Sequence, residues 1–171
     1  MFDSGGGSTQ FTFADGDALE EQFSLDVGAV NVAERYGLQG VVDDGALDAA
    51  LAGIEASLGR LRDRPTGAAV VGMGGTITNL TAVQHGLTTY DPAVVHGSVL
   101  PLAEIERQIA LYRGRTADER RTIPGLQPKR AEVILGGACI VRTVLTMLGA
   151  DSLRVNDHGL RYGLLAERFG G

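Results

Sequence analysis

Two glycine-rich turns, each beside a short predicted strand, constrain the fold of this chain more than any other feature. The first turn, residues 3–9 (DSGGGST), is followed directly by residues 10–14, which alternate between polar and apolar side chains as a half-buried strand does. The second turn, residues 72–76 (GMGGT), ends the almost wholly apolar residues 68–73 and leads into a helical pattern. This combination of strands, turns and helices predicts an α/β domain.

Both turns have the composition of a phosphate-binding loop. Glycine lacks a β-carbon, so successive backbone N–H groups can approach a bound anion closely, and the helix after the second turn adds a favourable dipole. Asp3, at the entrance to the first turn, is a candidate ligand of Mg²⁺ or of its bound water. The predicted phosphate-binding residues are Gly5, Gly6, Gly7, Ser8, Gly74, Gly75 and Thr76.

Each turn also has a simpler interpretation. A Gly-Gly-Gly-Ser string is typical of a flexible linker, and a tight strand-to-helix connection uses glycine even where no ligand binds. The second turn matches neither the Gly-x4-Gly-Lys-Ser/Thr loop nor a complete Gly-x-Gly-x-x-Gly fingerprint. Neither turn by itself therefore identifies a function.

Length and composition indicate one domain, residues 1–171. This is an ordinary single-domain length, and an apolar fraction of 44% with mean hydropathy +0.06 excludes wholesale disorder. No apolar run approaches the roughly 20 residues that span a membrane. The single cysteine, Cys139, is expected in the core, and neither a disulfide framework nor an export leader is indicated. We expect a soluble, cytoplasmic protein that does not bind membranes.

The charge of the chain is acidic overall but unevenly distributed. The formal net charge is −6, and Arg35 is the one basic residue among residues 1–55. Residues 101–130 are rich in arginine and would attract a polyanion, although arginines paired with carboxylates on solvated helix faces give the same pattern. Whole-chain acidity argues against nucleic-acid binding.

The order of the predicted elements is that of one lobe of an actin-like protein. Antiparallel strands around the first turn and at residues 10–14 and 22–27 precede a helix, a strand, further helices, a last strand and a last helix. We expect a mixed five-stranded sheet with helices on both faces, as in the actin-like (ribonuclease H-like) ATPase superfamily. The predicted helices are residues 29–36, 43–61, 77–85, 101–113, 117–121, 128–148 and 160–169, and the later strands are residues 68–73 and 152–155.

Motifs in a fixed order run along almost the whole chain. They occupy residues 3–9, 23–36, 71–80, 95–97, 119–131 and 156–165. Together they resemble the second lobe of the Ppx/GppA phosphatase family, the exopolyphosphatases and guanosine pentaphosphate phosphohydrolases, whose phosphate turn reads Asp-Ile-Gly-Gly-Gly-Ser-Thr. Tyr162 stands where the family's closing motif usually has Glu, so a polar contact near the last helix is expected to be missing.

The resemblance implies hydrolysis of a terminal phosphoanhydride, in inorganic polyphosphate or guanosine pentaphosphate, with Mg²⁺. It implies that backbone amides of both turns hold the terminal phosphoryl group, that Asp3 helps to place the metal ion, and that a carboxylate orients water. In the family, a preceding lobe supplies that glutamate. We expect this chain to lack that first lobe and to be inactive or weakly active by itself, with no general base assigned.

The same residues fit two other functions. An ATP-binding kinase lobe would use Gly136 and Gly137, which are similar to the glycine pair beside adenosine in actin-like ATPases, although this pair also suggests close helix packing. A non-catalytic binding module would form a homodimer through an apolar wall left without its partner lobe. His85, His96 and His158 have no spacing suited to a metal site, and we expect surface or capping roles for them.

Overall fold

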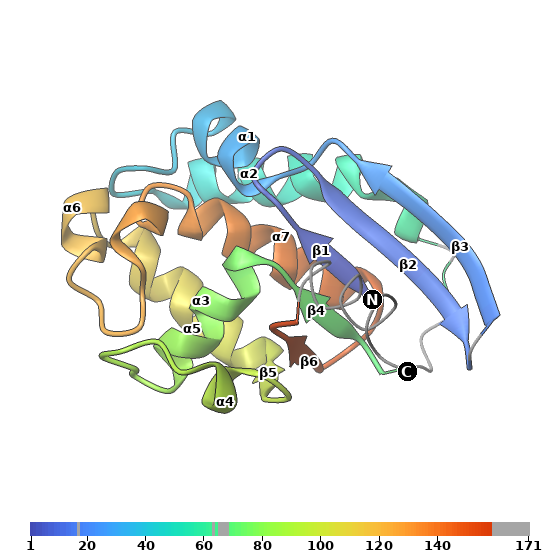
Figure 1. Ribbon diagram of the computed structural model, residues 1–171. Helices are drawn as coiled ribbons and strands as arrows, with labels where there is room; N and C mark the ends of the chain where they lie inside the picture. Colours follow the sequence, from blue (N-terminus) through green and yellow to red (C-terminus); the bar gives the residue numbers. More distant parts are fainter. Residues whose placement is uncertain (17, 63, 65–68, 159–171) are drawn as a thin grey trace.

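The computed structural model describes residues 1–16, 18–62, 64 and 69–158, and its centre is a six-stranded mixed sheet in the order β3-β2-β1-β4-β6-β5 (Figure 1). The first three strands form the predicted antiparallel meander, β1, β4 and β6 are parallel, and β5 is antiparallel to β6. The strands are β1 (Phe2–Ser4), β2 (Thr9–Asp15), β3 (Ala18–Leu25), β4 (Val71–Met73), β5 (Val99–Pro101) and β6 (Ser152–Asn156).

The sixth strand, β5, corrects the five-stranded sheet expected from the sequence. It has three residues and ends at Pro101, which the sequence pattern assigns to the start of a helix. β5 is an edge strand that pairs only with β6, with Leu100 opposite Leu153, and proline is tolerated at an edge because one side of the strand has no ladder. So short a strand has no alternation that a sequence pattern can reveal.

The helices pack mainly around α7, which contacts α1, α2, α3 and α5. Asp43 caps α2, because its carboxylate accepts the Ala46 N–H at 2.8 Å. No helix among the described residues is long and apolar enough to cross a membrane, and the helix expected at residues 160–169 lies outside those residues. The helices are α1 (Ala29–Arg35), α2 (Asp44–Ser57), α3 (Gly75–Gln84), α4 (Pro92–Val95), α5 (Leu102–Arg113), α6 (Ala117–Arg120) and α7 (Ile134–Met147), with 3-10 helices η1 (Gly59–Leu61) and η2 (Pro128–Arg130).

The long helix expected over residues 128–148 is divided in two. It begins with the 3-10 turn η2, and α7 starts separately at Ile134. At the break the Ala131 carbonyl, which a continuous α-helix would use for the N–H four residues later, accepts Nη1 of Arg120 at 3.4 Å. As a result, Arg130 ends a separate turn and is not part of α7.

Gly136 and Gly137 let α7 pack closely on α1 and on the start of α3. A Cβ at Gly136 would lie 2.9 Å from the carbonyl oxygen of Ala29, and one at Gly137 would lie 2.7 Å from Oγ1 of Thr76. The pair is therefore occupied by protein contacts, which supports close packing and gives the ATP-binding alternative no support. Cys139 is fully buried as predicted, and burial raises the pKa of its thiol to about 12.

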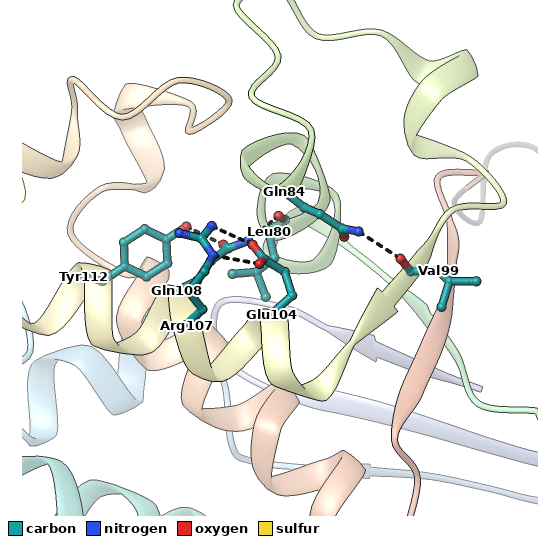
Figure 2. A network of polar contacts seen from close by, with 7 residues as sticks. All are labelled: Leu80, Gln84, Val99, Glu104, Arg107, Gln108 and Tyr112. Atoms are coloured by element: carbon teal, nitrogen blue, oxygen red, sulfur yellow. Dashed lines mark hydrogen bonds and ion pairs between the residues drawn. The ribbon is translucent and has the colours of Figure 1, made fainter.

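A largely buried polar network joins α3 to α5 (Figure 2). Nε2 of Gln108 donates to the carbonyl of Leu80 at 2.8 Å and to Oε1 of Glu104 at 2.7 Å, while Oε1 of Gln108 accepts the Tyr112 hydroxyl at 2.6 Å. Arg107 donates twice to the same Glu104 carboxylate, both times at 2.7 Å. Through the Leu80 carbonyl the network ties α5 to α3, the helix that begins within the second glycine turn.

Candidate anion-binding site

The two glycine turns lie side by side at the carboxyl edge of the sheet. β1 and β4 are parallel neighbours with Asp3 opposite Met73, so the turns that follow them leave the sheet at the same edge. A Cβ at Gly74 would collide with the Asp3 carboxylate and would lie 2.9 Å from the carbonyl oxygen of Ser4, so the turns are in close contact. Gly74 also has a φ of +97°, which L side chains rarely adopt. Ligands of open α/β sheets bind beyond the carboxyl ends of strands, where both turns lie.

Helix α1 fixes the orientation of the first turn by bonding all of its glycine carbonyl groups. Gly28, the residue before α1, is so close to the turn that a Cβ there would collide with the Gly6 carbonyl. In a trans peptide the N–H points away from the carbonyl, so these bonds direct the N–H groups to the opposite side. The bonds are Ala29 N to Gly5 O (3.0 Å), Val30 N to Gly6 O (2.9 Å) and Asn31 Nδ2 to Gly7 O (3.0 Å).

The N–H groups on the opposite side belong to Gly6, Gly7 and Ser8. None of them donates a hydrogen bond within the described residues, whereas the Gly5 N–H closes the turn by donating to the Ser8 carbonyl at 2.9 Å. The Ser8 hydroxyl accepts Nε2 of Gln10 at 2.7 Å, which leaves its own hydrogen available for donation. Adjacent unpaired N–H groups of this kind form a concave nest that suits an oxyanion.

The second turn leads into the N-terminus of α3, where further N–H groups are unpaired. Gly75, Thr76 and Ile77 donate to no acceptor within the described residues, since the first bond of the helix runs from the Thr78 N–H to the Gly74 carbonyl at 3.1 Å. Thr76 is almost completely buried, and its hydroxyl makes no hydrogen bond in the described part of the chain. The partial positive charge of this helix end favours an anion.

Arg130 adds a full positive charge beside the second turn. A Cβ at Gly75 would lie 2.6 Å from Cζ of Arg130, so the guanidinium lies directly against this glycine. No carboxylate among the described residues pairs with it, whereas Arg107, Arg113 and Arg121 of the same arginine-rich segment all form ion pairs. A cation beside the positive end of a helix is repelled by it, and an anion between the two removes that repulsion.

The sequence indicated the residues of both turns but not Arg130 as a member of the site. Arg130 is one of many arginines in residues 101–130, and no local spacing sets it apart from those that pair with carboxylates. Its contact with Gly75 depends on the packing of η2 against α3, which no short-range pattern encodes. Arg115 and Arg120 also lack a carboxylate partner among the described residues, but both donate to backbone carbonyls, whereas Arg130 lies against the second turn.

Asp3 lies where the two turns meet. Its carboxyl group is half-buried beside Gly74, and burial raises its pKa above the ordinary value. The carboxylate makes no hydrogen bond or ion pair within the described residues, and these residues contain no group of three or more His, Cys, Asp or Glu that could hold a metal ion. A metal ion at Asp3 would therefore take its other ligands from water and from phosphate oxygens.

Two of the three histidines form a pair beyond the end of β6. The rings of His96 and His158 are stacked with their centroids 3.9 Å apart, and the Asp157 N–H donates to Nδ1 of His96 at 3.4 Å. His85 lies 3.3 Å from the hydroxyl of Ser98 through its Nε2. No sequence pattern predicts the stacked pair, because residues 96 and 158 are far apart in the chain and come together where β5 pairs with β6.

The fold and the site together define a class of protein. A sheet that combines an antiparallel meander with parallel strands, and places two glycine turns at one carboxyl edge, is a lobe of the actin-like ATPase superfamily. The model of the Ppx/GppA phosphatase family matches residues 1–170. The chain therefore belongs to the Ppx/GppA phosphatase family.

Relatives and solved structures agree with this assignment. Exopolyphosphatase 2 of Mycobacterium tuberculosis is 30% identical over 96% of this chain and 53% of its own length. A bifunctional 3-dehydroquinate synthase/phosphatase of Fusobacterium nucleatum is 29% identical over 98% of this chain and 26% of its own length. A crystal structure of the Aquifex aeolicus Ppx/GppA phosphatase superimposes with a TM-score of 0.92 at 33% identity, over 98% of this chain and 56% of that one. The chain thus spans about half of the length of the exopolyphosphatase and of the Aquifex protein.

Proposed function

We propose that this chain is the phosphate-binding lobe of a phosphoanhydride hydrolase, and that it holds the terminal phosphoryl group of inorganic polyphosphate or guanosine pentaphosphate. The observation that carries the proposal is the set of unpaired N–H groups from both turns at one edge of the sheet, with the unpaired guanidinium of Arg130 beside them. An exopolyphosphatase among the relatives supports polyphosphate as the class of substrate.

The proposed chemistry depends on positioning and on charge. Phosphoryl transfer passes through a transition state whose negative charge is spread over the terminal phosphoryl oxygens, so donors fixed in advance lower the barrier. The N–H groups of the first turn would hold one side of the phosphoryl group, and those of the second turn the other. Arg130 would neutralise charge on the same oxygens.

Mg²⁺ is the metal ion that we propose at Asp3. A single carboxylate that has no partner among the described residues, next to the proposed phosphate-binding donors, fits an ion that commonly binds one or two carboxylates together with phosphate oxygens and water. When bound, the ion would neutralise charge on neighbouring phosphates. Because burial raises the pKa of Asp3, protons compete for this carboxylate more strongly than for an exposed one, and metal affinity is expected to fall at acid pH.

We propose that a carboxylate outside this chain orients the attacking water. The relatives of known structure and the exopolyphosphatase are about twice as long as the region they share with this chain, which leaves room for a second lobe. The chain by itself is then expected to bind phosphate chains but to hydrolyse them slowly.

Self-association through the apolar surface that a second lobe would cover is a separate prediction. Light scattering over a range of protein concentrations tests it.

The proposal predicts that Arg130→Ala weakens binding of inorganic tripolyphosphate about tenfold or more, because a hydrogen bond to a charged group contributes about 1.5–3 kcal/mol. Lys129→Ala is the matched control. It removes the same charge from the same turn, but Lys129 is exposed, so only a weak, salt-screened effect is expected.

Isothermal titration calorimetry at fixed ionic strength measures both variants, and circular dichroism confirms that they are folded. Unchanged affinity in Arg130→Ala would contradict the proposed site. Equal losses in the two variants would mean that tripolyphosphate responds only to the overall charge of the segment.

A further inference from the structure

Asn79 connects two parts of the candidate site that are far apart in the sequence. It lies on α3, one turn after Gly75, and is 1% exposed. Its Nδ2 donates to the carbonyl oxygen of Gly75, and its Oδ1 accepts the backbone N–H of Gln127, both at 2.8 Å. Because both ends of the amide are bonded, the side chain has one orientation, with its donor toward the glycine turn and its acceptor toward the segment that precedes η2.

The connection continues from Gln127 to Arg130. Gln127 is the N-cap of η2, and its carbonyl accepts the Arg130 N–H at 2.8 Å. The guanidinium of Arg130 then lies back against Gly75. A closed ring of contacts therefore joins Gly75, Asn79, Gln127 and Arg130, and the Asn79 amide is the bridge in it between α3 and η2.

Other contacts hold the surrounding segment in place on either side of this bridge. Gly125, with a φ of +88°, packs so tightly on α3 that a Cβ there would collide with the carbonyl of Ala82. Beyond η2, Nη1 of Arg120 holds the carbonyl of Ala131 at 3.4 Å. The segment is thus attached before and after η2 without Asn79, whereas the Gln127 N–H depends on the Asn79 side chain.

We infer that Asn79 is a positioning residue for phosphate binding, which sets the place of Arg130 relative to the N–H groups of the second turn. The inference rests on the proposed function, because it assigns Asn79 to the same anion site. Without the bridge the Gln127 N–H loses its acceptor, and η2, still attached at Gly125 and Ala131, loses the hydrogen bond that sets its distance from α3. The unpaired guanidinium at its end then no longer faces the ligand at a fixed distance.

Asn79→Thr tests the inference with little change to α3. A threonine hydroxyl donates to the carbonyl four residues earlier in a helix, as Thr81 does to Ile77 at 2.9 Å, so Thr at position 79 keeps the bond to Gly75. It is too short to reach Gln127. Asn79→Ser makes the same change with a smaller side chain, should the threonine variant be unstable. Thr81→Val is the matched control, because Thr81 is buried on the same helix and its hydroxyl bonds only within that helix.

The decisive measurement is a double-mutant cycle on tripolyphosphate affinity, with urea unfolding recorded for every variant. Asn79→Thr is expected to weaken binding about five- to tenfold, the effect of one lost hydrogen bond. In an Arg130→Ala background it should change affinity less than about twofold, because the residue through which it acts is gone. Thr81→Val should lower stability and leave affinity unchanged.

The possible results distinguish the role of Asn79 from the anion site itself. If Arg130→Ala weakens binding while Asn79→Thr does not, or weakens it by the same factor in both backgrounds, the role of Asn79 is wrong and the site stands. If Arg130→Ala has no effect on tripolyphosphate affinity, the site and the inference are both overturned. A loss of affinity in Thr81→Val equal to that in Asn79→Thr would reduce the effect to general destabilisation of α3.

Discussion

Ser4, at the end of β1, is fully buried, and its hydroxyl has no hydrogen-bond partner within the described residues. A buried hydroxyl without a partner costs about 1–3 kcal/mol of desolvation. The family's phosphate turn has isoleucine at this place, which agrees with an apolar environment. The residue before the first glycine is thus a local source of instability next to the candidate site.

Ser4→Ala is expected to leave the free energy of unfolding unchanged or to raise it by up to about 1 kcal/mol, because the unpaired hydroxyl is removed. Thr9→Val is the control. The buried Thr9 hydroxyl donates to the Val27 carbonyl at 2.6 Å, so its loss should lower stability by about 1 kcal/mol. Urea unfolding of the two variants distinguishes these cases, and a clear loss of stability in Ser4→Ala would show that its hydroxyl is bonded in the folded protein.

The residues of the site differ in how far their positions can be predicted from the sequence. The glycines of both turns were predictable, because the need for a missing β-carbon after a strand is local. Arg130 and Asn79 were not, since each is placed by contact with a segment far along the chain. The glycines that provide the backbone donors of the candidate site can be predicted from the sequence. The side chains that surround these donors can be identified only in the folded structure.

At the scale of elements, the predictions held where periodicity is long and failed where packing decides. The meander, α2 and β4 have clear patterns and were predicted. The three-residue β5 has too few residues to show alternation, and the break before α7 falls at residues 131–133, where the Ala131 carbonyl accepts Nη1 of Arg120. Both errors concern short pieces that are stable only because neighbours pair with them.

The network between α3 and α5 gives the fold a dependence on pH. The guanidinium of Arg107, with a smaller contribution from Gln108, holds the pKa of Glu104 below its ordinary value of 4.5. A carboxyl group whose pKa is lowered by folding stabilises the native state above its unfolded pKa. This stabilisation is lost as the pH falls from about 4.5 through the lower pKa of the folded state.

Glu104→Gln is therefore expected to destabilise the protein by about 1 kcal/mol at pH 7, and the difference from the unsubstituted chain should shrink below pH 4.5. Glu106→Gln is the control, because Glu106 is on the same helix and its ion pair with Arg142 is open to solvent. Urea unfolding at pH 7 and at pH values below 4.5 measures the difference. A difference for Glu104→Gln that stays constant with pH would contradict the role given to its charge.

For the whole molecule, the main fact is that the chain spans about half of the length of the exopolyphosphatase and of the Aquifex aeolicus protein. A chimaera that joins the unmatched part of the Aquifex aeolicus Ppx/GppA phosphatase to this chain is expected to release phosphate from polyphosphate, whereas the chain alone releases it slowly. A colorimetric phosphate assay compares the two, with the Arg130→Ala chimaera as a control for the site. Equal rates for the chain alone and the chimaera would show that no second lobe is needed.

Helix α1 occupies the carbonyl side of the first turn, so the donor side is already set before any ligand arrives. Backbone amides do not ionise near neutral pH, and no side-chain replacement other than proline removes their N–H groups. The phosphate binding proposed for this turn is therefore expected to stay constant while surface residues change during evolution. Relatives with different side chains around the first turn are therefore expected to keep its backbone N–H donors.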